Sequence, residues 1–174
     1  GLSPQLQAAL PEDGVVAGRT SSSWLYNASV VIPVAGPLSA FVATTPGIEE
    51  AGTAPQNAAN RYEVLPPVLA RQSEVGMYLR SAGGLTAIAT AFEIKKPEPG
   101  FDIDGVYRYL STSQHRGIEA SVAAPIADRS RIVLGALWMH PELSGKLVES
   151  GTVGRRPVGR SSRISSVSVE HRVA

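Results

Sequence analysis

The stretch of sequence that decides the fold is residues 71–80, which reads Arg71-Gln72-Ser73-Glu74-Val75-Gly76-Met77-Tyr78-Leu79-Arg80. Within it, Val75, Met77 and Leu79 alternate with more polar neighbours. Successive side chains of a β-strand point to opposite faces of the sheet. The period of two therefore predicts a strand with one apolar face and one polar face.

The same alternation recurs along the chain, in stretches bounded by glycine and proline. Only residues 3–10 suggest a helix. We therefore predict an all-β fold of about seven strands. The strands are expected at residues 22–32, 38–44, 71–80, 85–94, 106–124, 131–140 and 160–173.

The connections between these strands alternate in length. Residues 33–37, 81–84 and 125–130 form short turns, whereas residues 45–69, 95–105 and 141–159 form long polar or glycine- and proline-rich stretches. Outer-membrane barrels show this asymmetry, because their periplasmic turns are short and their extracellular loops are long. The pattern predicts an antiparallel up-and-down transmembrane β-barrel, of which this chain forms a part. A soluble sandwich has no reason to keep its long loops at one end.

Three aromatic residues fit the same orientation. Trp24 and Tyr26 lie at the start of the first predicted strand, and Trp138 lies near the end of the sixth, before a long loop. Aromatic side chains with a polar group favour the membrane interface. We therefore expect all three at the outer interface. In a soluble β domain they would be ordinary strand aromatics.

The composition excludes several classes of protein. The chain has 174 residues with a net charge of +1, which gives no electrostatic basis for binding nucleic acid. It contains no cysteine, and its three histidines are dispersed, so we expect no metal site and no cofactor. The motifs of a nucleophile elbow and of a phosphate-binding loop are missing, and we expect no enzymatic activity.

Several short motifs resemble, in their order and spacing, those of TonB-dependent outer-membrane receptors of the siderophore type. Residues 46–67 are similar to an extracellular loop of that family, and residues 154–159 complete the order. The resemblance covers roughly two thirds of the chain. Three strand motifs carry it: Gln72-Ser73-Glu74-Val75-Gly76, Phe92-Glu93-Ile94-Lys95-Lys96-Pro97, and Arg116-Gly117-Ile118-Glu119-Ala120-Ser121.

The resemblance implies that residues 1–174 are part of the β-barrel domain of such a receptor, within a closed barrel of about 22 strands. The family's plug domain has no counterpart in this chain. The resemblance also implies an outer-membrane location, contact with membrane lipid, a ferric siderophore as ligand, and TonB acting through a plug domain outside this chain. The alternatives are a soluble or surface-exposed antiparallel β domain that binds a partner or carbohydrate, and an outer-membrane enzyme or plain porin.

Nine residues are candidates for a role in this barrel, and each also has a plainer interpretation as a structural strand residue. The first group would point into the lumen and hold neighbouring strands or a plug domain: Glu74, Gly76, Arg116, Gly117 and Glu119. The second group would line an upper vestibule, where aromatic and basic side chains suit a large anionic siderophore: Tyr107, Arg108, Tyr109 and His115.

Overall fold

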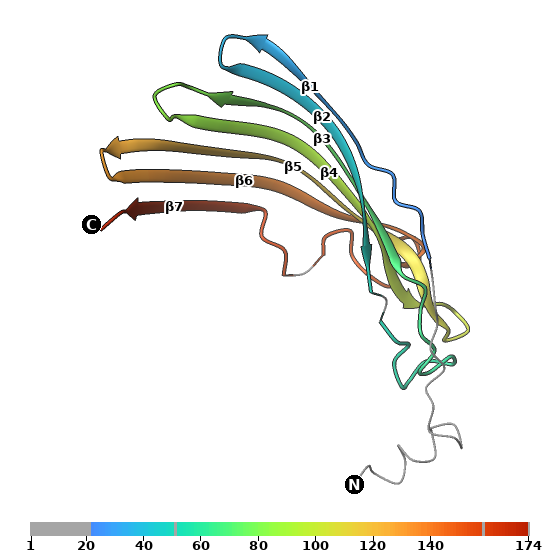
Figure 1. The fold of residues 1–174 in the computed structure, drawn as a ribbon. Coiled ribbons are helices and arrows are strands. Elements are labelled where there is room, and N and C mark those ends of the chain that lie inside the picture. The colour runs from blue at the N-terminus through green and yellow to red at the C-terminus, as the bar shows by residue number, and fades with distance from the viewer. Residues whose placement is uncertain (1–21, 51, 158, 174) are drawn as a thin grey trace.

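The computed structural model describes residues 22–50, 52–157 and 159–173, most of which belong to β-strands (Figure 1). One short helix, α2 (Lys146–Glu149), follows the sixth strand. The helix suggested for residues 3–10 lies outside the described residues. The strands are β1 (Ala28–Ala35), β2 (Leu38–Glu49), β3 (Val68–Arg80), β4 (Thr86–Phe101), β5 (Tyr107–Ala127), β6 (Ser130–Gly145) and β7 (Arg163–His171).

Each strand pairs antiparallel with the next strand along the chain, so the sheet has the order β1 to β7. The predicted all-β, up-and-down arrangement of seven strands is confirmed. Figure 1 shows the sheet as a single curved layer. Among the described residues, no helix is long and apolar enough to cross a membrane.

The two ends of the sheet differ as the sequence predicts, with one exception. Short turns join the strands at one end, which we call the short-turn end, and residues 50–67 and 146–162 connect them at the other, the long-loop end. The prediction of a long loop at residues 95–105 is wrong. There β4 continues to Phe101 and pairs with β5 from Tyr107, which leaves only a tight turn at residues 102–106. The hairpin extends because β4 and β5 pair with each other beyond the last β3–β4 pair, at Lys95.

Prolines mark the three places where the register shifts. The shifts lie between Pro33 and Ala35, between Glu98 and Pro99, and between Pro125 and Ala127. Proline has no backbone N–H to donate, so it is confined to sheet edges and bulges. Pro97 and Pro99 are tolerated in β4 because β3 no longer pairs with β4 beyond Lys95.

The register arranges apolar side chains in continuous rows on one side of the sheet, which we call the apolar face. Residues directly opposite each other in an antiparallel pair share a face. The first row contains Val30, Val42, Val75, Ala91, Ile118 and Trp138. The next row toward the short-turn end contains Ile32, Ala40, Met77, Ala89, Ala120 and Ala136. The third contains Leu38, Leu79, Ala87, Val122, Leu134 and Val167.

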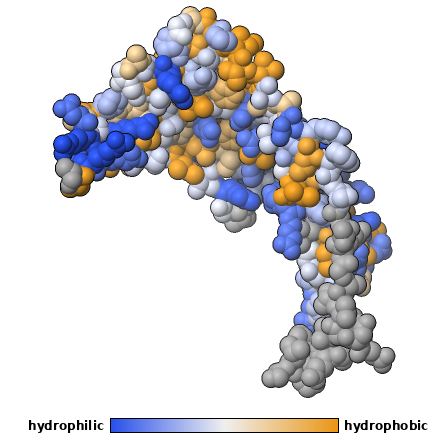
Figure 2. Space-filling view, in the orientation of Figure 1, coloured by the Kyte–Doolittle hydropathy of each residue, from blue (hydrophilic) through white to orange (hydrophobic). Residues whose placement is uncertain are grey.

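The apolar face ends abruptly on the side of the long loops. The row after Trp138 is polar and contains Thr44, Ser73, Glu93, Arg116 and His140. Glu93 forms ion pairs with Lys95 at 2.8 Å and with Arg116 at 2.6 Å. Figure 2 shows hydrophobic residues along the crest of the arch that the sheet forms. The sheet thus carries an apolar band of three rows with a charged border.

Most of the buried side chains lie at the long-loop end, because a single layer offers its strands no second layer to pack against. The loop at residues 52–67 is hydrogen-bonded to the turn between β4 and β5, and Leu147 of α2 packs against Gly100. The best-buried apolar residues of this cluster are Ala54, Ala58, Leu65, Val68 and Leu147.

Candidate functional site

The two loops that face each other at the long-loop end are tied together by hydrogen bonds. The side chain of Asn60 binds the backbone of Tyr107 twice: Tyr107 N–H donates to Asn60 Oδ1 at 2.8 Å, and Asn60 Nδ2 donates to the Tyr107 carbonyl at 3.0 Å. Ala59 N–H donates to the Gly105 carbonyl at 2.8 Å. The Asn60 side chain thereby satisfies the backbone N–H and C=O groups of Tyr107, as a neighbouring strand would. The two loops together form an ordered surface at the long-loop end.

Three of the four predicted vestibule residues lie on this surface. The ring of Tyr107 lies 5.1 Å from that of Phe101, centroid to centroid. Arg108 forms an ion pair with Asp102, whose carboxylate lies 2.6 Å from the guanidinium. The Tyr109 hydroxyl donates to the Pro66 carbonyl at 2.8 Å. All three side chains therefore support the loops, and ligand binding by them stays a prediction.

The fourth predicted vestibule residue, His115, lies apart from the other three. It pairs with Ile94 and Pro141 in the middle of the sheet, and its Nε2 lies 3.1 Å from the Ser113 hydroxyl. His115 is eight positions from Tyr107 along the extended strand β5, so the two residues are roughly 25 Å apart. The structure therefore does not bring the four residues into one cluster.

Asp102 organises the tight turn between β4 and β5. Its Oδ1 accepts hydrogen bonds from Val106 N–H at 2.9 Å and from Asp104 N–H at 3.0 Å. These two bonds, together with the Arg108 guanidinium, hold the pKa of the Asp102 carboxyl below its usual value, and the Val106 bond has the largest effect. The carboxylate is therefore a structural part of this turn.

Four of the five predicted lumen residues share the face opposite the apolar one, which we call the mixed face. Glu74 and Gly117 flank Phe92 in one row across the sheet, and Gly76 and Glu119 flank Thr90 in the next. Glu74 accepts a hydrogen bond from Gln72 Nε2 at 3.2 Å. Among the described residues, no side chain binds Glu119, whose carboxylate is exposed. The mixed face combines carboxylates, glycines and large aromatic rings.

The glycines of the mixed face lie beneath aromatic rings of the preceding strand. A methyl group added at Gly76 would lie 2.7 Å from Phe41 Cζ, and one added at Gly117 would lie 2.8 Å from Phe92 Cζ. Each ring thus covers a backbone position that carries no side chain of its own, an arrangement that stabilises strand glycines. Both glycines therefore lie where a neighbouring ring and a neighbouring backbone oxygen approach closely.

The fifth predicted lumen residue, Arg116, lies on the other face. It pairs with Glu93 and His140 and belongs to the polar border of the apolar face. The assignment of Arg116 to the same face as Glu119 is wrong, because three positions along a strand reverse the direction of the side chain. Its guanidinium binds Glu93 instead of the carboxylates of the mixed face.

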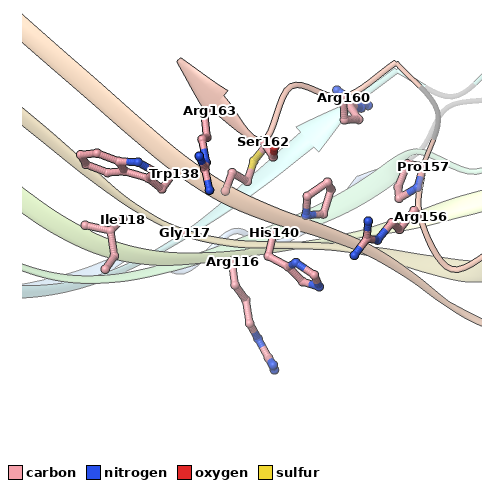
Figure 3. Close-up of a pocket in the computed structure, with 12 residues that line it drawn as sticks. Arg116, Gly117, Ile118, Trp138, His140, Arg156, Pro157, Arg160, Ser162 and Arg163 are labelled. Atoms are coloured by element: carbon pink, nitrogen blue, oxygen red, sulfur yellow. The ribbon is translucent and has the colours of Figure 1, made fainter. Parts of the chain in front are cut away.

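An open hollow of about 700 Å³ lies beside Arg116, at the border of the apolar face. It is surrounded by strands β5 and β6, the start of β7, and Arg156, Pro157, Arg160 and Ser162 of the preceding loop (Figure 3). Sequence reasoning missed this site, although four arginines within residues 155–163 were a signal for it. The side chains that give the hollow its character are Arg116, Ile118, Trp138, His140, Arg156, Arg160 and Arg163.

The described part of the chain contains no cluster of potential metal ligands. No group of three or more His, Asp or Glu side chains there is placed to hold a metal ion. The histidines His115, His140 and His171 lie on different strands.

Comparison with known proteins finds the same sheet in solved receptors. No family model and no curated protein matches the chain. The ferric preacinetobactin receptor BauA from Acinetobacter baumannii matches 84% of the chain with a TM-score of 0.66 and 23% sequence identity. The ferric-catecholate import receptor Fiu from E. coli K12 matches 95% of the chain with a TM-score of 0.65 and 18% identity. The chain has the fold of part of an outer-membrane β-barrel.

This barrel wall corresponds to a fraction of each solved receptor. It spans 22% of the BauA chain and 26% of the Fiu chain. The predicted resemblance to siderophore receptors and the predicted partial barrel are confirmed at the level of the fold. In a barrel, the two edges of the sheet at β1 and β7 pair with further strands, which removes the unpaired N–H and C=O groups of an open sheet.

Proposed function

We propose that the chain is part of the wall of an outer-membrane receptor that takes up a ferric siderophore with energy from TonB. The observation that carries the proposal is the continuous apolar band with its charged border, in a fold similar to two ferric siderophore receptors. A lipid-facing band of this kind is what the hydrocarbon core of a membrane requires. The mixed face then borders the lumen.

The height of the apolar band supports a membrane-spanning wall. Its three rows span four residues along the strands, and Ile132, paired with Val169 toward the short-turn end, extends the band to six residues on β6. At about 3.4 Å per residue this is roughly 20 Å between the outermost Cα atoms, and the side chains add to it. Outer-membrane barrels carry an apolar band of about 25 Å.

In this proposal the long-loop end faces the outside, where the ordered surface around Asn60 and Tyr107 meets the ligand. The barrel wall supplies loops and lumen surface and performs no catalysis. TonB would act through a plug domain outside this chain. The carboxylates of Glu74 and Glu119 face the lumen and are placed to contact such a domain.

Uptake of labelled ferric siderophores by cells with and without the intact protein tests this function. Under iron limitation, cells that lack the protein should lose uptake of one class of siderophore, and the cloned gene should restore it. Deleting TonB should abolish the same uptake. Recovery of the protein in the soluble fraction, or uptake that does not depend on TonB, would contradict the proposal and favour a soluble or surface-exposed β domain.

A further inference from the structure

Residues 144–154 form a loop whose two ends are fastened to each other. Leu143 N–H donates to the Arg155 carbonyl at 2.7 Å, and the Arg155 guanidinium lies 3.8 Å from the Glu142 carboxylate. The loop begins at the end of β6, and α2 forms its first turn. Loops with closed ends of this kind are compact and are packed by their own groups. We call residues 146–153 the body of the loop.

The body of the loop is held together from within. Ser150 N–H donates to the Lys146 carbonyl at 2.9 Å, and Val153 N–H donates to the Leu147 carbonyl at 3.1 Å. The Ser150 hydroxyl donates a further bond to the Leu147 carbonyl at 3.2 Å. Within the described part of the chain, no hydrogen bond or ion pair joins the body to another segment. The body can therefore move as one unit without breaking a polar contact to the sheet.

An apolar contact joins the body to the sheet. The buried side chain of Leu147 packs on Gly100 of β4, where its Cγ lies 3.3 Å from the position that a methyl group at residue 100 would take. Gly100 lies an even number of positions after Phe92 along β4, so it belongs to the mixed face. In the proposed barrel, the body of the loop therefore lies on the lumen side of the β4–β5 hairpin.

Features on both sides of this contact favour its release. Gly145, which joins β6 to the body, has a φ of +110°, and glycine moves between such backbone conformations without steric cost. Gly154, between the body and the fastened ends, has open space where a side chain would lie. Ser111, which pairs with Gly145, is 6% exposed, and its hydroxyl has no hydrogen-bond partner among the described residues. A buried hydroxyl without a partner destabilises the arrangement that buries it.

We propose that the body of the loop is a lid, which rotates at Gly145 and Gly154 between a docked position, with Leu147 on Gly100, and a raised position. The inference rests on the proposed function and adds a means of regulation to it, because the mixed face lines a lumen only in a barrel. The docked lid narrows the mouth of that lumen at the β4–β5 hairpin. The raised lid clears the hairpin for an entering ligand and opens the Ser111 hydroxyl to water.

Distances between two spin labels on the intact receptor in detergent test the lid. The labels are attached to cysteines introduced at Glu149 on the lid and at Asp104 in the turn between β4 and β5. We expect two distances in the wild type, one for each position of the lid. Gly100→Ala should favour the raised position, because the added methyl group collides with Leu147. Ser111→Ala should favour the docked position about tenfold, because the unpaired hydroxyl is gone.

Gly52→Ala is the matched control, since a methyl group at this glycine of the other long loop would meet nothing within 4 Å. It should leave both distances and their proportions unchanged. Leu147→Ala removes the same contact from the side of the lid, and it replaces Gly100→Ala if that variant does not fold. A single distance that is the same in the wild type and in Leu147→Ala overturns the proposal, and so does an equal shift in the control.

Uptake of a ferric siderophore separates the lid from the proposed function. In Gly100→Cys/Leu147→Cys, the Cβ at residue 100 and the sulfur at residue 147 take positions close to those in a disulfide, because Leu147 Cγ occupies the place of that sulfur. Oxidation should lock the lid and slow uptake several-fold, and a reductant should restore it. Equal uptake with and without the disulfide overturns the lid. If the wild type shows both distances but takes up no siderophore, the proposed function fails while the motion of the lid stands.

Discussion

The ring of Phe92 lies over Gly117 on the neighbouring strand, so close that a methyl group at Gly117 would be 2.8 Å from Phe92 Cζ. Phe41 stands in the same relation to Gly76, two strands earlier in the sheet. In both pairs the added group would also lie 2.5 Å from a carbonyl oxygen of the following strand, that of Ala89 at Gly76 and that of Trp138 at Gly117. In each pair, the position of the aromatic ring therefore requires a glycine on the facing strand.

Replacing Gly117 with alanine should destabilise the folded wall. The new methyl group meets both a ring and a backbone oxygen, so the ring must leave its position or the strands must move apart. Overpacking of this kind costs about 1–3 kcal/mol. The loss of the heat-modifiable folded form on a gel should occur at a lower temperature than in the wild type. Gly47→Ala is the control, because its methyl group would meet only Ala70 Cβ at 3.8 Å. Equal shifts in both variants would contradict the proposed dependence.

The apolar face should reject charge, whereas the mixed face should accept it. An arginine at Val122 or Leu134, which are opposite each other on the apolar face, should impair assembly at a cost of about 2–4 kcal/mol near the membrane midplane. Ser121→Arg is the matched control, since Ser121 is adjacent to Val122 and points to the mixed face, which borders the lumen in the proposed barrel. Folding yield in lipid vesicles measures the difference. Equal sensitivity at all three positions would argue for a soluble sheet.

The orientation of the wall can be read from chemical labelling, because the chain contains no cysteine of its own. Single cysteines introduced at Asn57, Asp104 or Gly151 should react with an impermeant reagent on intact cells, since all three lie at the long-loop end. Cysteines at Gly84 or Asp128, in the turns of the opposite end, should react only after the cells are opened. The reverse pattern would invert the proposed topology.

The turn at Asp102 should lose its order in acid. The pKa of Asp102 is lowered, chiefly by the hydrogen bond from Val106. A lowered pKa stabilises the fold above the ordinary aspartate value of about 3.9, and this contribution is lost as the pH falls through the lowered value. Hydrogen-exchange protection of the Val106 amide, corrected for the intrinsic rate, should be constant from about pH 7 to 5 and fall below about pH 4. In Asp102→Asn, whose side-chain oxygen can still accept these bonds but does not titrate, protection should not change with pH over this range. The same acid response in both proteins would contradict this role.

The sequence predicts the faces of the strands better than their ends. Alternation within β3 and within β5 assigns Val75 and Ile118 to the apolar face of their strands. This assignment needs no information about the pairing between strands, because the period of two is a local property. The extent of the β4–β5 hairpin depends on pairing between strands. Pro97 and Pro99 therefore suggest a loop, although both lie in β4.

The candidate site was predictable only where it depends on alternation. The period of two places Gly76 and Gly117 on the face opposite the apolar residues, whereas their partners Phe41 and Phe92 follow from the register alone. The hollow could not be predicted from alternation. It joins Trp138 to Arg156 and Arg160 through the path of the loop after α2, and no local pattern describes that path.

The double hydrogen bond between Asn60 and Tyr107 has a mechanical consequence. It joins two loops whose residues are 47 positions apart in sequence, and the bonds from Ala59 to Gly105 and from Tyr109 to Pro66 reinforce it. At about 0.5–1.5 kcal/mol each, the four bonds hold the loops together by about 2–6 kcal/mol, so the separated form is a minor population of about 3% or less. A ligand that pushes on one loop must therefore displace the other as well. The loop that contains Asn60 and the turn between β4 and β5 therefore move together as one unit.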